Sequence, residues 1–146
     1  MDPYECGRPR GGTKAALGLA LLLVGLAACG GGARSLSCTG YDALVDALRA
    51  VASAEAADAS GDTEAVERAM DDVSRFVRLA RGRLAGADAD SNSGAAARAL
   101  LEAANYLEFM VGDFRATGSV DFSLTQFASR ELNRAASGAG GAPLNC

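Results

Sequence analysis

The residues of this chain best suited to chemistry are its four cysteines, because the sequence contains no histidine. Histidine is the usual general base near neutral pH and a common ligand of zinc, copper and haem. The sequence also lacks a Cys-x-x-Cys pair, a glycine-rich phosphate loop and a Gly-x-Ser-x-Gly nucleophile turn. We therefore expect a protein that is not an enzyme and that uses neither a metal nor a cofactor.

One acidic side chain has an unusual position. Glu55 follows the apolar stripe of Leu44, Leu48 and Val51 on the first predicted helix. A carboxylate buried there would be a candidate functional group. The alternative is that the helix extends past the packed layer, so that Glu55 reaches water, as acidic side chains usually do.

An apolar run at 15–28 ends in the sequence Leu26-Ala27-Ala28-Cys29. The run has 14 residues, which is fewer than the roughly 20 that a membrane-spanning helix needs. Three basic residues precede it, as in an export signal. The four-residue motif resembles the lipobox of bacterial lipoproteins. This resemblance implies diacylglyceryl transfer to Cys29, cleavage before Cys29, and a protein held on the extracytoplasmic face of the cell membrane. The alternative is an ordinary secretory signal that is cleaved after Ala28.

The domain organisation follows from that resemblance. We expect a signal peptide at 1–28, a lipidated flexible tether at 29–37 and one helical domain at 38–146. If Cys29 carries lipid and Cys6 leaves with the leader, Cys38 and Cys146 remain as a pair in an oxidising compartment. We expect them to form a structural disulfide. A redox-active pair is the alternative, but it lacks the usual close spacing.

The charge of the exported segment excludes one class of partner. The leader holds three of the 14 basic and two of the 18 acidic residues, so the remainder has a net charge of −5. Nucleic-acid binding depends on clustered basic residues that contact phosphates. We therefore expect no nucleic-acid partner and expect the lipid on Cys29 to make the contact with the membrane.

The hydrophobic pattern between Cys38 and Cys146 is helical throughout. Apolar residues recur at spacings of three and four, and polar breaks occur at 60–62, 86–93 and 117–119. We expect an all-α domain, an antiparallel up-down-up-down four-helix bundle closed by the terminal disulfide. The four expected stripes are Tyr41, Leu44, Leu48, Val51 and Ala52; Val66, Met70, Val73, Val77, Ala80 and Leu84; Leu100, Ala104, Leu107, Met110, Val111 and Phe114; and Leu124, Phe127, Ala128, Leu132 and Ala135.

The helix starts carry local signals. Thr39 is expected to cap the first helix, and either Asp62 or Thr63 the second. Ser123 and Gln126 fit a capping box, with Phe122 and Phe127 as a hydrophobic staple. On the second helix, spacings of four predict the ion pairs Glu64–Arg68 and Asp71–Arg75.

Two features are candidates for a partner surface. Arg68, Arg75 and Arg78 follow one side of the second helix, where they either bind an anionic group or form a solvated face. Phe109 lies nearly opposite Leu107 on the third helix, and an exposed aromatic side chain can anchor a protein interface. We expect a surface-tethered helical module that binds a protein or an envelope component. The alternative is a structural or solute-binding lipoprotein, with a small apolar ligand among Phe76, Phe114 and Phe127.

Overall fold

The computed structural model describes residues 36–86, 94–138 and Leu144. The chain divides into two units, Met1–Gly32 and Ala33–Cys146, and every described residue belongs to the second. The predicted signal peptide at 1–28 and Cys29 therefore lie outside the described residues. Cys146 lies outside them as well.

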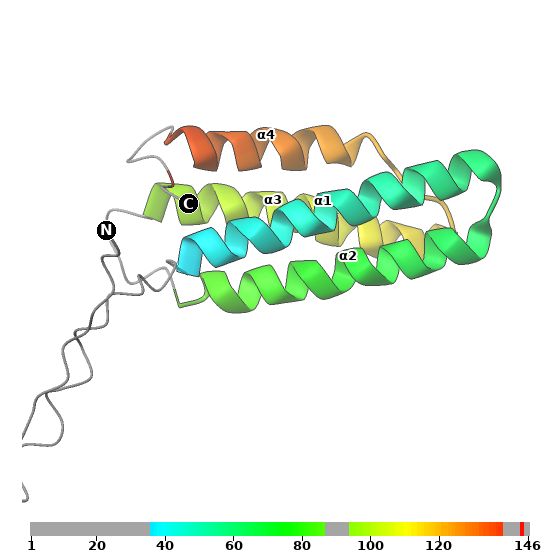
Figure 1. Cartoon of the computed structure of the whole chain (residues 1–146), viewed down its shortest axis with the longest axis horizontal. Coiled ribbons are helices and arrows are strands. Elements are labelled where there is room, and N and C mark those ends of the chain that lie inside the picture. Colours follow the sequence, from blue (N-terminus) through cyan, green and yellow to red (C-terminus); the bar gives the residue numbers. More distant parts are fainter. Residues whose placement is uncertain (1–35, 87–93, 139–143, 145–146) are drawn as a thin grey trace, which may run out of the picture. The chain divides into compact units, whose positions relative to one another are not determined.

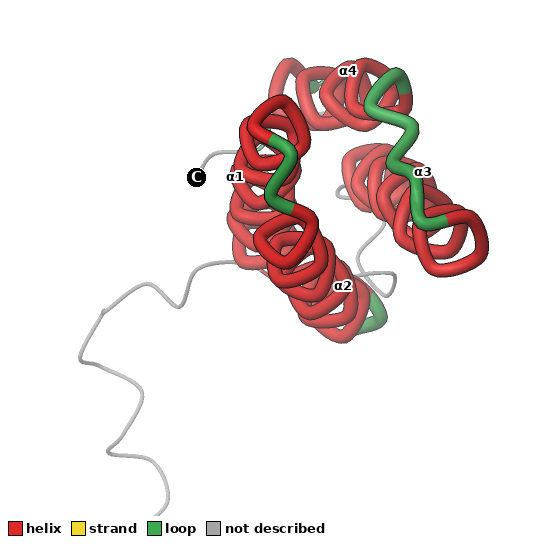
Figure 2. The backbone as a smooth tube through the Cα atoms, turned by 90° about the vertical axis from the view of Figure 1, so that its right-hand side faces the viewer, coloured by secondary structure: helices red, strands yellow, loops and turns green. Residues whose placement is uncertain are grey.

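The described part of the chain is built of four helices and contains no strand. They are α1 (Leu36–Ser60), α2 (Thr63–Leu84), α3 (Gly94–Thr117) and α4 (Leu124–Ser137). Successive helices run in opposite directions (Figure 1), and α4 contacts α3 and, less extensively, α1. Viewed along the helices, α2 and α4 occupy opposite corners and do not contact each other (Figure 2). The prediction of an all-α antiparallel four-helix bundle is confirmed.

The core is made of small side chains, and alanine accounts for half of the buried hydrophobic residues. All six residues of the stripe predicted on α2 are buried. The stripe predicted on α1 includes one residue that does not belong to the core, because Ala52 is exposed. The largest fully buried side chains are Leu44, Val51, Met70, Val73, Leu84, Leu100, Leu107 and Met110.

The first helix begins earlier than the sequence suggested. It starts at Leu36, so Thr39 lies inside the first turn and is not its cap. The Thr39 hydroxyl donates a hydrogen bond to the carbonyl oxygen of Leu36, at 3.0 Å. This extension is stabilised by packing, since Ser37 and Cys38 are both buried. The sequence signal at Thr39 depends only on neighbouring residues, so it could not indicate that Ser37 and Cys38 are buried in the bundle.

Helices α1 and α2 approach closely at Gly40. A Cβ atom built on Gly40 would lie 2.9 Å from two carbon atoms of Leu84, a fully buried side chain. The missing side chain of Gly40 therefore provides the space that Leu84 fills. At the other end of this helix pair, the Asp62 carboxylate accepts a hydrogen bond from the Ala65 amide at 3.0 Å. Asp62, one of the two predicted caps, is thus the cap of α2.

The start of α4 differs from the predicted capping box. Ser123 is the residue that precedes the helix, but its side chain makes no capping hydrogen bond. The Ser123 hydroxyl instead donates to the Asp121 carboxylate at 2.6 Å, and the Ser123 amide donates to the same oxygen at 3.0 Å. Gln126 donates its amide proton to the Ser123 carbonyl oxygen. An N-cap side chain accepts a backbone amide proton from an extended backbone conformation, but Ser123 has helical backbone angles, φ −62° and ψ −28°, so the Gln126 amide bonds to its carbonyl oxygen instead.

The prediction that Phe127 belongs to the inward stripe of α4 is also wrong. Phe122 packs partly buried against the core, but Phe127 is 42% exposed. Phe127 therefore lies at the edge of the apolar stripe of α4, whereas Ala128, Leu132 and Ala135 form its centre.

These contacts predict how the start of α4 responds to mutation. Asp121→Ala should lower the free energy of unfolding by about 1 kcal/mol, since it removes the acceptor of two hydrogen bonds and an acidic group before the helix. Ser123→Ala should cost less than half as much, because the Ser123 amide keeps its acceptor. Urea unfolding of the two variants makes the comparison. Equal losses, or a larger loss for Ser123→Ala, would contradict this account.

Candidate functional site

An aromatic surface lies on the outer side of α3 and α4. We define it by Tyr106 and Phe109 of α3 and Phe127 of α4. Phe109 is 66% exposed, as predicted, and is the most exposed large hydrophobic side chain of the described residues. The rings of Tyr106 and Phe127 stack with centroids 5.4 Å apart. Tyr106 precedes Phe109 by three residues, so the two are neighbours on the helix surface.

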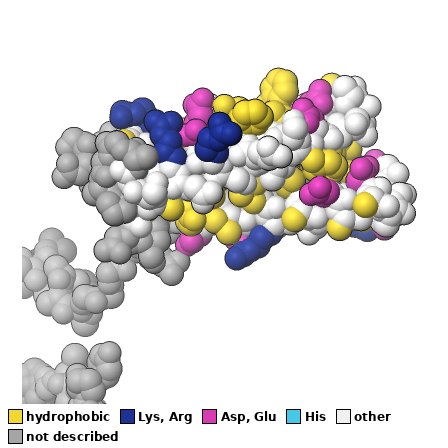
Figure 3. Space-filling model, turned by 90° about the horizontal axis from the view of Figure 1, so that it is seen from above, with side chains coloured by type: hydrophobic (Ala, Val, Ile, Leu, Met, Phe, Trp, Pro, Cys, Tyr) yellow, Lys and Arg dark blue, Asp and Glu magenta, His cyan; other side chains and the backbone are white. Residues whose placement is uncertain are grey.

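Charged side chains border this aromatic surface. The Arg130 guanidinium lies 5.7 Å from the centroid of the Phe127 ring, and Glu102 is exposed on the same helix as Phe109. Figure 3 shows exposed hydrophobic side chains gathered on the face that carries α4, with acidic and basic groups at their edges. An apolar centre with a polar rim is the usual composition of a protein interface. Sequence reasoning found Phe109 but missed Tyr106, although its spacing of three from Phe109 was a usable signal.

The three arginines predicted as a second surface do not act together. Arg68 forms an ion pair with Glu64 at 2.5 Å, as predicted. Arg75 pairs with Asp72 at 2.9 Å and lies 4.5 Å above the Phe76 ring, so the predicted pair Asp71–Arg75 is wrong. Arg78 is exposed on α2 and lines a hollow between α2 and α3. Arg68 and Arg75 thus form a solvated, locally neutralised face, and Arg78 belongs to a different feature.

Asp71 of α2 forms an ion pair with the neighbouring helix α3. Its carboxylate lies 3.6 Å from the Arg115 guanidinium of α3. A second bridge between the same helices is made by Arg81, which donates to the Asn105 amide oxygen at 2.6 Å and to the Glu108 carboxylate. Asn105 and Glu108 therefore link α3 to α2.

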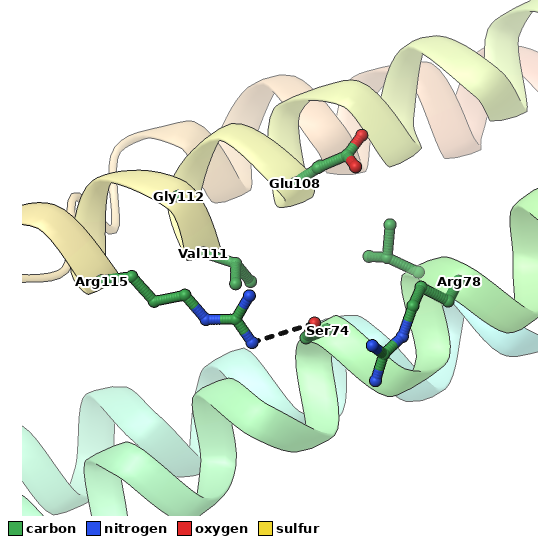
Figure 4. Close-up of a pocket in the computed structure, with 7 residues that line it drawn as sticks. Ser74, Arg78, Glu108, Val111, Gly112 and Arg115 are labelled. Carbon is green, nitrogen blue, oxygen red and sulfur yellow. Dashed lines mark hydrogen bonds between the residues drawn. The ribbon is translucent and has the colours of Figure 1, made fainter.

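A hollow of about 220 Å³ lies between these two bridges. Val77 of α2 and Val111 of α3 form its apolar lining, and Arg115 reaches across to the Ser74 hydroxyl at 3.3 Å (Figure 4). We call it the α2–α3 hollow. The described residues that line it are Ser74, Val77, Arg78, Glu108, Val111, Gly112 and Arg115.

The other residues that the sequence singled out do not gather into a site with the residues described above. Glu55 is exposed and reaches water, as the alternative held, but α1 does not extend past the packed layer there, because the neighbouring Ala54 is fully buried. Cys38 is 3% exposed in the first turn of α1. Phe114 lines a second hollow that shares Arg115 with the first, whereas Phe127 is on the surface. Within the described ranges, no cluster of three or more acidic or cysteine side chains could hold a metal ion.

None of the helices that the structure describes is long and apolar enough to cross a membrane. No protein-family model, curated protein or solved structure matches this chain. The structure defines the protein as a four-helix bundle with an exposed aromatic surface.

Proposed function

We propose that this protein is a bacterial lipoprotein whose helical bundle binds a protein or cell-envelope partner through the aromatic surface. The single observation that carries the binding role is the exposure of Phe109, 66%, beside the stacked rings of Tyr106 and Phe127. Fully burying a phenylalanine side chain gains about 1.5–3 kcal/mol of apolar transfer free energy. Aromatic and arginine side chains are also enriched among the residues that dominate interface energies.

The anchor rests on the sequence alone. The motif Leu26-Ala27-Ala28-Cys29 resembles a lipobox, and lipidation there places the bundle at the extracytoplasmic face of the cell membrane. The bundle then needs no membrane contact of its own. Residues between Cys29 and Leu36 are mostly small or polar, a composition suited to a flexible tether.

The lipid anchor predicts a complete loss of labelling in one variant. Cys29→Ser should take up no radiolabelled fatty acid and should leave the membrane fraction, because the serine hydroxyl is not the acceptor of the diacylglyceryl group. Cys38→Ala, the control, should be labelled as strongly as the wild type. Equal labelling of the wild type and Cys29→Ser would rule out the lipobox.

The disulfide between Cys38 and Cys146 is part of the same proposal. Cys38 lies in the first turn of α1. The first and last helices of the bundle, α1 and α4, run in opposite directions (Figure 1). The end of α4 is therefore at the same end of the bundle as Cys38. Eight residues separate the end of α4 at Ser137 from Cys146, enough chain to return to α1.

The binding role is tested by capture of a partner on the native membrane. We expect a photocrosslinking residue at position 106 of the lipidated full chain to give one discrete adduct. Phe109→Ala should abolish that adduct, because it removes the apolar centre of the surface. Leu79→Ala is the matched control, since Leu79 is 46% exposed on a different helix, α2. An adduct that survives Phe109→Ala, or that Leu79→Ala removes equally, would contradict the proposal.

A further inference from the structure

The α2–α3 hollow combines an apolar lining with positive charge. Arg78 and Arg115 lie on its rim, and its one carboxylate, Glu108, is bound by Arg81. The lining residues therefore carry a net charge of +1, whereas the whole chain carries −4. This local excess of positive charge favours an anionic ligand.

The two arginines have spare hydrogen-bonding capacity. Among the described residues, Arg115 makes only long polar contacts, 3.3 Å to the Ser74 hydroxyl and 3.6 Å to the Asp71 carboxylate. Arg78 is exposed and makes no ion pair with any residue that the structure describes. In Figure 4 the two guanidinium groups lie on either side of Ser74. A guanidinium presents five N–H donors in a planar fork that matches a carboxylate.

Gly112 keeps the hollow open on the α3 side. Glycine in a helix interior lowers stability relative to alanine, and here no close packing requires it. A Cβ atom built on Gly112 would meet nothing within 4 Å. The free space beside Val77 and Val111 is thus available to a ligand and is not filled by the protein.

We propose that the α2–α3 hollow binds a small monocarboxylate with a compact apolar body. The carboxylate lies between Arg78 and Arg115, and the apolar body lies against Val77 and Val111, over Gly112. Pockets for drug-sized ligands measure about 300–1,000 Å³, so a hollow of about 220 Å³ suits a smaller molecule. This site is separate from the aromatic surface, and its ligand does not depend on the partner proposed above.

Benzoate is the probe, tested on the isotope-labelled full chain in a nonionic detergent by amide NMR. We expect shifts that centre on Ser74, Gly112 and Arg115, with a dissociation constant in the millimolar range for so small a ligand. Benzyl alcohol and benzylamine, which keep the ring and lose the negative charge, should bind at least about tenfold more weakly. Equal affinity for benzyl alcohol, or shifts that centre elsewhere, would overturn the proposal.

Two glycines provide a matched pair of variants. Gly112→Leu should fill the hollow and abolish the benzoate shifts. Gly82→Leu should leave them unchanged, since Gly82 is outside the lining and its built Cβ is equally free of neighbours. Arg115→Gln should weaken binding about tenfold, whereas Arg68→Gln, on the solvated face, should not. The Arg115 comparison decides the matter if Gly112→Leu unfolds, and undiminished binding to Arg115→Gln would overturn the proposal.

Discussion

Leu107→Ala should destabilise the bundle by about 2–5 kcal/mol. Leu107 is fully buried in the middle of α3, where its side chain packs between the helices. The core around it is rich in alanine, so few large neighbours can move into the space that the leucine leaves. Urea unfolding of the full chain measures the change in the free energy of unfolding.

Phe109→Ala is the control for this prediction, because Phe109 lies only two residues away on the same helix. Its ring is 66% exposed, so we expect the loss to stay below about 1 kcal/mol. If Phe109→Ala were as damaging as Leu107→Ala, Phe109 would not be a free surface residue. A small loss also makes the capture experiment interpretable, since any effect on the adduct then comes from the surface and not from unfolding.

The second large effect concerns the proposed disulfide. A bond between Cys38 and Cys146 closes nearly the whole folded segment, and a loop of about 100 residues contributes up to about 4.7 kcal/mol in the chain-entropy model. Reduction should therefore lower the urea midpoint of the exported chain strongly. Intact-mass analysis should find no alkylated cysteine before reduction and two after it.

Single variants separate the bond from the packing of Cys38. Cys146→Ala removes the disulfide without changing a described residue of the core, and Cys38→Ala removes it at a buried position. Both should lose a similar free energy of unfolding. A loss for Cys38→Ala alone would mean that Cys38 stabilises the bundle only as a buried side chain.

The local periodicity of the chain was sufficient to predict the helices. Val66, Met70, Val73, Val77 and Leu84 are all buried as the pattern on α2 required, because a helix places residues three and four apart on one face whatever it packs against. The break between α1 and α2 could also be predicted, because glycine is the residue that best tolerates the positive φ of a turn. Gly61 has a φ of 75° in the structure. The exposure of Phe109 followed from the same geometry.

Features at the edges of the stripes required the tertiary structure. Phe127 was predicted to be inside, but its exposure depends on how α4 is turned against Tyr106 of α3. Ser123 does not cap α4 with its side chain, because its helical backbone angles direct the Gln126 amide to the Ser123 carbonyl oxygen, while the hydroxyl donates to Asp121. Each of these outcomes is a choice between alternatives of similar free energy, and a local pattern does not rank them.

The candidate sites divide in the same way. The chain by itself determined the motif that resembles a lipobox, the absence of histidine and the outward position of the aromatic side chain at 109, because these depend on residue identity and on helix phase. The tertiary structure alone decided that Asp71 turns to Arg115, that Arg81 joins α2 to α3, and that Gly112 faces an open hollow. Such contacts join residues more than 20 positions apart, and they depend on the distance and rotation between two helices, which no periodicity within either helix specifies.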